Sequence, residues 1–216
     1  MKKKLLLAVL IVFLFGSSQL SAQGFAIGAK ASTLGLSFEL DKSIFENLNL
    51  KAGGAFFNYT HEGGGGSDDY TYEGKLELSS FFLLADWFPF GNSIRLTGGA
   101  LINLNKANVV LVPSKSYTVG GDEYSPSELG SLSADVDFNP VSPYIGLGIG
   151  NPVSGDSGLK FTFDIGTIYQ GAPTVDLTGT GLIEPSAAPD QEAQLEDNIS
   201  WFNWYPVVSF GLMYKF

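Results

Sequence analysis

The 216-residue sequence contains no cysteine and a single histidine, and only 16% of its residues are charged. Without cysteine the chain can form neither a disulfide framework nor a lipoprotein anchor, so its stability must come from packing, strand ladders or lipid. Basic residues are also scarce, with 12 Lys and Arg against 22 Asp and Glu. This balance argues against nucleic acid as a partner.

The sequence also lacks an apolar run long enough for a spanning helix. Its longest run, from Leu5 to Phe15, is about half of the roughly 20 residues that such a helix needs. Lys2, Lys3 and Lys4 precede this run and Ser21-Ala22 follows it. We therefore predict a signal peptide over residues 1–22 and one mature domain over residues 23–216. Loss of the three lysines would leave a net charge of about −13.

The hydrophobic residues of the mature part are abundant but interleaved with polar ones. Hydrophobic residues make up 44% of the sequence and aromatic residues 13%. Near the C-terminus, every second residue falls on one predominantly apolar face: Pro206, Val208, Phe210, Leu212, Tyr214 and Phe216. The intervening residues are small, polar or less apolar, so this period-two pattern predicts a strand with one face suited to lipid.

Similar alternation recurs along the chain and predicts eight strands in total. The other segments lie around residues 25–29, 34–40, 48–51, 73–84, 94–103, 136–149 and 159–166. The apolar phase slips between Ala29 and Leu34, which indicates a tight turn near Ser32. Short connections (41–47, 90–93, 151–158) then alternate with long ones (61–69, 106–133, 174–203), as in transmembrane β-barrels. If the first two of these segments formed one long strand, the short and the long connections would exchange sides of the membrane. Eight strands are favoured over seven or nine.

Two segments depart from simple alternation. Pro140 and Pro143 interrupt the sixth strand, and the apolar phase changes between Phe138 and Ile145, so we predict a β-bulge. Further on, Leu195 and Ile199 have helical spacing within residues 190–202. This spacing predicts a short amphipathic helix, capped near Asp190, that lies over a barrel rim.

The basic residues indicate which strand face meets lipid. Six of those outside the signal peptide fall on polar strand faces, namely Lys30, Lys51, Lys75, Arg95, Lys160 and Lys215. The others fall in turns or loops, namely Lys42, Lys106 and Lys115. A Lys or Arg facing hydrocarbon costs about 2–4 kcal/mol at the membrane midplane, and an open sheet edge cannot be satisfied there. The pattern therefore predicts a closed barrel with its charges inside.

Aromatic residues cluster where the strands would cross the membrane interfaces. These residues are Trp87, Phe88, Phe90, Trp201, Phe202, Trp204, Tyr205 and Phe216. Such clusters are typical of aromatic girdles. The predicted fold class is an all-β, eight-stranded, antiparallel up-and-down transmembrane β-barrel with long outer loops and one short helix.

The polar strand face supplies the candidate functional residues. We expect the following side chains to line the lumen: Lys30, Glu39, Lys51, Lys75, Glu77, Arg95, Asn103, Lys160, Asp164 and Gln170. The interior of an eight-stranded barrel is only about wide enough for side chains to fill. These residues could therefore form an ion-pair network that plugs the lumen, or they could line a narrow route for ions or small solutes.

A second candidate feature is an acidic outer rim. The residues assigned to it are Asp176, Glu184, Asp190, Glu192, Glu196 and Asp197. Such a rim would attract cations at low salt. Solvated loops at a surface bridged by divalent ions explain the same residues equally well.

The sequence offers little for catalysis or cofactor binding. A nucleophile and base must be held rigidly in hydrogen-bonding reach, but His61, the only histidine, stands next to the flexible run Gly63 to Gly66. No segment has the spacing of a phosphate loop or a calcium loop. We therefore expect no catalytic residues, no metal site and no cofactor.

Several short segments resemble a known family of small outer-membrane barrels. They are Ile27-Gly28-Ala29-Lys30, Ala85-Asp86-Trp87-Phe88-Pro89-Phe90, Ser142-Pro143-Tyr144-Ile145-Gly146-Leu147-Gly148, residues 169–177 and Tyr205-Pro206-Val207-Val208. Their succession is similar to the CarO-type family of porin-like proteins and covers most of the mature chain. The resemblance implies residence in the outer membrane and uptake of basic amino acids such as ornithine.

The leading functional hypothesis from the sequence is therefore a narrow channel for small cationic solutes. The competing hypothesis is a non-conducting structural or surface-interaction barrel. Expected partners are outer-membrane lipids and lipopolysaccharide. The last strand, which ends in Phe216, also resembles the signature that the barrel-assembly machinery reads.

Overall fold

The computed structural model describes residues 24–65, 68–91 and 93–216, so the predicted signal peptide, residues 1–22, lies outside the described residues. Within these ranges a closed antiparallel ring forms, in which strands pair with their neighbours along the chain. Its eight strands are β1 (Phe25–Ser32), β2 (Gly35–Phe45), β3 (Leu48–Gly64), β4 (Tyr70–Trp87), β5 (Ile94–Asn103), β10 (Val141–Ile149), β11 (Gly158–Tyr169) and β13 (Trp204–Lys215). The predicted eight-stranded up-and-down barrel is confirmed.

The predicted tight turn between the first two strands is also present. It consists of Thr33 and Leu34 between β1 and β2. The next residue, Gly35, has a φ of +100°, which side-chain-bearing residues rarely adopt, and its backbone approaches Phe56 closely. Leu34, in this turn, points into the barrel and is buried.

The long connections predicted as outer loops contain much regular structure. Residues 106–137 form β6 (Lys106–Pro113), β7 (Tyr117–Val119), β8 (Asp122–Tyr124), the short helix α2 (Pro126–Leu129) and β9 (Leu132–Asp137). Residues 174–199 form β12 (Thr174–Gly179), the 3-10 helix η2 (Gly181–Ala187) and α3 (Pro189–Ile199).

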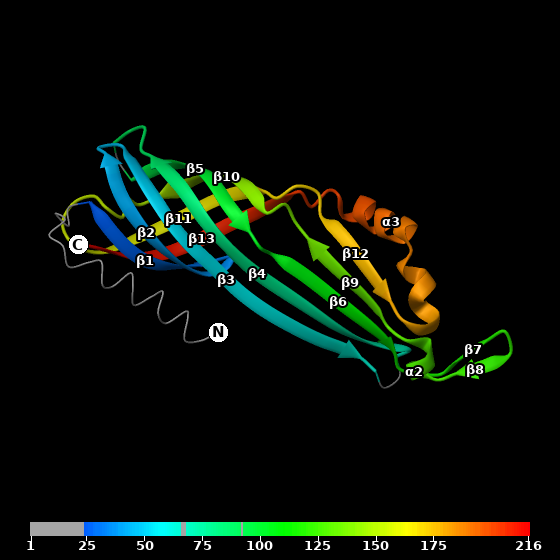
Figure 1. The fold of residues 1–216 in the computed structure, drawn as a ribbon. Coiled ribbons are helices and arrows are strands. Elements are labelled where there is room, and N and C mark those ends of the chain that lie inside the picture. Colours follow the sequence, from blue (N-terminus) through cyan, green and yellow to red (C-terminus); the bar gives the residue numbers. More distant parts are fainter. Residues whose placement is uncertain (1–23, 66–67, 92) are drawn as a thin grey trace, which may run out of the picture.

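Three of these strands extend one wall of the barrel. They pair in the order β12, β9, β6 and β4, followed by β3. We call this extension the outer sheet; it consists of β6, β9, β12, Phe57–Gly64 of β3 and Tyr70–Glu77 of β4. Figure 1 shows the outer sheet projecting from the barrel, with the β7–β8 hairpin at its far tip. We call the barrel end that carries the outer sheet the extension end, and the opposite end the short-turn end.

The strands are interrupted where the barrel meets the outer sheet, and hydrogen bonds bridge these interruptions. The predicted bulge in the sixth strand is such a break, because β9 and β10 are separate strands with different partners. At the break between β5 and β6, the amide of Ser79 donates to Asn105 Oδ1 at 2.9 Å. At the break after β11, the amide of Asn139 donates to the carbonyl of Gln170 at 3.1 Å.

The predicted amphipathic helix is α3, and it lies against the outer sheet rather than over a barrel rim. It packs against β12, which is an edge strand. The side chains of Glu196 and Glu192 accept hydrogen bonds from the amides of Val175 and Leu177 at 2.9 and 3.0 Å. No helix among the described residues is long and apolar enough to cross a membrane.

Within the barrel, outward positions are predominantly apolar. On β4, Phe81 and Leu83 point outward and are about half exposed, whereas Ser80 and Asp86 point inward and are buried. The same alternation continues around the ring and leaves an exposed apolar belt that includes Leu36, Phe38, Leu40, Ile145, Leu147, Phe161, Ile165, Phe210 and Leu212. A closed ladder with such a belt is suited to hydrocarbon.

The hydrophobic pattern inverts in the outer sheet. On β4, Lys75 and Glu77 continue the outward face, while Leu76 continues the inward face. A polar row crosses the sheet from Thr60 through Lys75, Asn108 and Asp135 to Asp176. A less polar row on the opposite face runs from Tyr59 through Leu76, Ala107 and Val136 to Val175. This is the pattern of a sheet in water rather than in lipid.

Candidate functional site: the barrel lumen

A layer of charged side chains crosses the middle of the lumen. Its members come from inward positions of different strands: Lys30 on β1, Glu39 on β2, Lys51 on β3, Arg95 on β5 and Asp164 on β11. Each of these residues is no more than 5% exposed. The structure therefore brings together half of the residues predicted to line the lumen.

Asp164 is the centre of this layer. One carboxylate oxygen lies 2.8 Å from Lys30 Nζ and accepts a hydrogen bond from Ser209 Oγ at 3.1 Å. The other oxygen pairs with the Arg95 guanidinium and lies 3.8 Å from Lys51 Nζ. Such a buried carboxylate is tolerated because several cationic or hydroxyl donors surround it.

The remaining pairs link this centre to neighbouring strands. Lys30 also lies 2.8 Å from Glu39, and Lys51 lies 3.0 Å from Asp86. Arg95 Nε lies 3.3 Å from the second oxygen of Asp86. Asp86 was not among the predicted lumen residues, although the inward position of this carboxylate on β4 completes the network.

Asp41 is the second carboxyl group that the sequence analysis missed. It lies at an inward position of β2 and is 0% exposed, and neither oxygen has a hydrogen-bond partner among the described residues. With Asp41, the layer contains four carboxyl groups but only three basic side chains. Two further basic side chains, Lys160 and Lys215, lie at inward positions nearer the short-turn end, so the interior as a whole has no excess of acidic groups.

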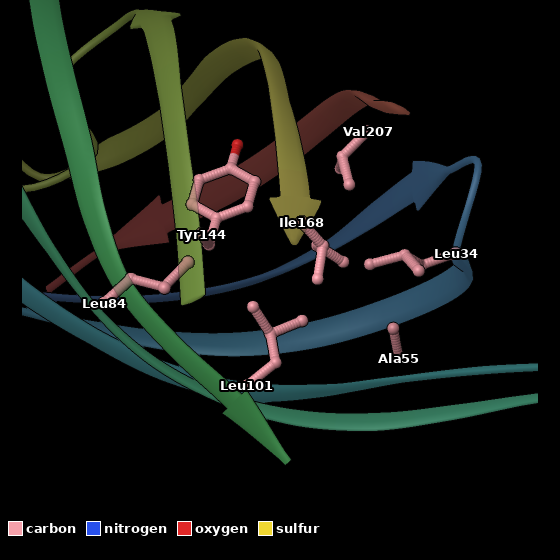
Figure 2. Packing of buried hydrophobic residues seen from close by; sticks show 7 residues of the cluster. All are labelled: Leu34, Ala55, Leu84, Leu101, Tyr144, Ile168 and Val207. Carbon is pink, nitrogen blue, oxygen red and sulfur yellow. The ribbon is translucent and has the colours of Figure 1, made fainter. Parts of the chain in front are cut away.

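An apolar layer closes the lumen between the charged layer and the extension end. Figure 2 shows the seven buried side chains that converge there: Leu34, Ala55, Leu84, Leu101, Tyr144, Ile168 and Val207. Phe82 and Tyr205 pack against them. Because these residues come from six of the eight barrel strands and from the turn between the other two, the layer spans the lumen.

A third layer closes the short-turn end, where the connection between β10 and β11 is folded inward. Its Pro152 and Val153 are buried, and Val153 clusters with Ala26 and Met213. Asn49 Nδ2 donates to Asn151 Oδ1 at 3.1 Å and fastens this connection to β3. Of the residues predicted to form aromatic girdles, Phe88 is buried and Tyr205 packs against the apolar layer of the lumen, whereas five others are exposed: Trp87, Phe90, Trp201, Trp204 and Phe216.

Little space remains between the charged and apolar layers. The cavity there has a volume of about 50 Å³ and is bordered by Lys30, Glu39, Lys51, Leu101, Tyr144 and Asp164, among others. A water molecule occupies roughly 30 Å³ of liquid. The cavity is therefore suited to a few water molecules rather than to a hydrated amino acid.

Other predicted lumen residues have different positions. Contrary to prediction, Lys75 and Glu77 lie outside the lumen on the outward face of the outer sheet, where Lys75 pairs with Glu73. Asn103 and Gln170 are buried near the strand interruptions between the barrel and the outer sheet.

Each of these two buried amides contacts backbone. The Oδ1 of Asn103 accepts from the amide of Asn105 at 3.2 Å, and Gln170 Nε2 donates to the carbonyl of Phe202 at 3.1 Å. Lys160 lies near the short-turn end and is only partly buried.

The predicted acidic rim does not encircle the barrel mouth. Its six residues all lie on β12, η2 or α3, along one edge of the outer sheet: Asp176, Glu184, Asp190, Glu192, Glu196 and Asp197. Glu192 and Glu196 bind the β12 backbone. Across residues 24–65, 68–91 and 93–216, no group of three or more acidic or histidine side chains is arranged to hold a metal ion.

A closed strand ring with an apolar outer face and a charged interior defines a transmembrane β-barrel of the outer-membrane type. Two solved structures from Acinetobacter baumannii share this fold. CarO has a TM-score of 0.57 and 19% identity, and the match covers 93% of this chain and 100% of that chain. CarO2 has a TM-score of 0.58 and 19% identity, with coverage of 90% and 99%.

Neither a protein-family model nor a curated protein matches the sequence. The likeness to the two Acinetobacter proteins therefore concerns the fold. It agrees with the CarO-type resemblance inferred from the sequence segments.

Proposed function

We propose that the protein is a closed outer-membrane barrel that supports its outer sheet above the membrane as a surface-interaction platform. The observation that carries this proposal is the three-layer closure of the lumen by the inward-folded connection, the ion-pair network and the apolar cluster. A non-conducting barrel needs such a sealed interior. The outer sheet supplies the large ordered structure outside the lipid belt.

Uptake of small cationic solutes, as the CarO-type resemblance implies, is the alternative function. The carboxylates of the charged layer would attract a passing cation. Passage of a basic amino acid would, however, require all three layers to move. Breaking pairs within a buried network by removing one partner typically costs about 3–5 kcal/mol, so an open state would need a compensating interaction.

We further propose that residues 1–22 direct export and are removed, and that the barrel then resides in the outer membrane. Its apolar belt would contact lipid, and its outer sheet would lie among lipopolysaccharide headgroups. The barrel-assembly machinery would read the last strand through Phe216. In cells, Phe216→Ala should lower the amount of heat-modifiable barrel in outer-membrane fractions, whereas Phe45→Ala, at another exposed aromatic near a strand end, should not.

The closed-barrel proposal can be tested by solute flux into liposomes. Refolded protein, with folding verified by a heat-dependent gel shift, is reconstituted and diluted into ornithine, arginine, glutamate or a neutral sugar. We expect no swelling above protein-free liposomes for any solute, with a general porin as the positive control. Swelling selective for ornithine and arginine would instead establish the uptake function.

A further inference from the structure

A second cavity lies at the far end of the outer sheet, and we call it the outer pocket. Its volume is about 450 Å³, within the range of roughly 300–1,000 Å³ that is usual for small-molecule sites. In Figure 1, this end of the sheet lies beside α2 and the base of the β7–β8 hairpin. Its lining is mainly apolar or aromatic and includes Tyr70, Leu111, Tyr117, Leu129, Leu132 and Ile183.

The outer pocket is built between the sheet and two short helices. Leu111 of β6 pairs in register with Leu132 of β9, and both lie on the same sheet face as Ala107 and Val136. Leu129 of α2 and Ile183 of η2 supply the helical wall. The less polar face of the outer sheet therefore ends in a pocket rather than on a flat surface.

The two helices are fastened to each other. The amide of Ser131, just after α2, donates to Thr180 Oγ1 at 2.9 Å, and the amide of Thr180 donates to the carbonyl of Ser131 at 2.9 Å. Gly181 has a φ of +63°, and a Cβ there would lie 2.7 Å from the carbonyl oxygen of Glu128, so only glycine allows this close approach. The pocket is therefore formed before a ligand binds, which reduces the entropy lost on association.

The mouth of the outer pocket carries groups that attract a cation. Tyr70 and Tyr117 are 54% and 42% exposed, and the face of a tyrosine ring attracts a cationic group. Among the described residues that line the pocket, only Asp69 is charged. Its carboxylate is substantially exposed and lies 3.0 Å from Lys115 Nζ.

The surroundings of the pocket are strongly acidic. Residues 57–64, 70–77, 106–137 and 174–199 together contain 14 Asp and Glu but only three Lys and no Arg. Such a charge distribution attracts cations and repels anions at low salt. A fatty acid or an anionic lipid is therefore disfavoured as a ligand, and the apolar lining disfavours a bare metal ion.

We propose that the outer pocket binds a small organic cation. The apolar body of this ligand fills the space between the sheet and η2, and its charged group stays at the mouth near Tyr70, Tyr117 and Asp69. The inference goes beyond the proposed function, because the pocket lies outside the barrel and requires neither a closed nor an open lumen.

Calorimetric titration of the refolded protein in lipid nanodiscs tests the ligand class. The probe is naphthylmethylammonium, with naphthylmethanol and naphthylacetate as its uncharged and anionic analogues and empty nanodiscs as the blank. We expect saturable binding of the cation, about tenfold tighter than binding of the alcohol, and the weakest binding for the acetate. Absence of saturable cation binding would overturn the proposal, and so would an equal affinity for the alcohol or the acetate.

A pocket-filling substitution tests the location of the site. Ile183→Trp should lower the affinity for naphthylmethylammonium by about tenfold, because the larger ring occupies the space of the ligand. Leu182→Trp is the matched control, since Leu182 also belongs to η2 but is 50% exposed outside the pocket. Equal affinities of the two variants would show that the cation binds elsewhere.

A charge substitution at the mouth leaves the apolar walls intact. Asp69→Asn removes the carboxylate and retains the Lys115 ammonium group, so it should weaken cation binding by about threefold or more and leave naphthylmethanol binding unchanged. Unchanged cation affinity would contradict the placement of the charged group at the mouth. Solute-dependent liposome swelling would overturn the closed barrel without affecting these titrations, so the two proposals fail independently.

Discussion

Replacement of Asp164 by Asn should substantially destabilise the barrel. The wild-type carboxylate contacts Lys30 at 2.8 Å, pairs with Arg95 and accepts from Ser209 at 3.1 Å, all in the buried charged layer. Loss of its charge leaves these cations with fewer counter-charges. Removal of one partner of a buried pair costs about 3–5 kcal/mol. Asn preserves the side-chain volume and can still accept a hydrogen bond, so we expect a loss of about 3 kcal/mol.

The assay is reversible urea unfolding in lipid vesicles, followed by fluorescence of the three tryptophans and by gel shift. Glu73→Gln is the matched control, because it removes a carboxylate from an ion pair with Lys75 that is substantially exposed on the outer sheet. Exposed pairs contribute about 0–1 kcal/mol. A loss below about 1 kcal/mol for Asp164→Asn, similar to the control, would show that the charged layer does not stabilise the barrel.

Three further predictions follow from other parts of the structure. Leu147→Arg, in the apolar belt, should lower the free energy of unfolding in vesicles by about 2–4 kcal/mol. The control Val110→Arg, on the outward face of the outer sheet, should change the free energy of unfolding little. Equal effects of the two substitutions would contradict the inversion of the hydrophobic pattern. The double variant Glu192→Gln/Glu196→Gln should accelerate proteolytic cleavage within α3 without altering the heat-dependent gel shift, because it weakens the acceptors for the β12 amides; unchanged cleavage would argue against edge capping. The hydroxyl and the backbone amide of Ser125 donate hydrogen bonds to the Glu128 carboxylate and lower the pKa of Glu128. The contact therefore stabilises the folded protein at pH values above the ordinary pKa of a glutamate. This stabilisation is lost as the pH falls through the lowered pKa of Glu128. An NMR titration should show a higher Glu128 pKa in Ser125→Ala, and an unchanged pKa would exclude the contact.

The strand pattern could be predicted from the sequence wherever a strand lies in one environment. Strand β13 stays within the barrel, so its alternation directly identifies the outward face that includes Phe210 and Leu212. Strand β4 crosses from the barrel into the outer sheet, and its hydrophobic pattern inverts between these environments. Predicting one phase for the whole strand placed Lys75 and Glu77 in the lumen, opposite to the structure.

The same inversion explains the sixth strand and part of the missed site. The phase change between Phe138 and Ile145 marks the passage from β9 to β10 rather than a bulge. Asp86 was missed because the incorrect phase of β4 concealed its inward position. Asp41 was missed because β2 extends through residues predicted to form a turn. The sequence signal that could have identified this architecture is a point where the alternation of apolar and polar residues stops and then resumes with the apolar residues on the opposite strand face.

Single-channel recording in a planar bilayer tests the closed lumen most directly. The refolded protein, with insertion verified by protease protection and folding by gel shift, is held under a salt gradient while ornithine, arginine or glutamate is added. The three closed layers predict a silent bilayer at moderate voltage. Discrete cation-selective conductance steps that basic amino acids block would contradict the closed-barrel account and establish a solute channel.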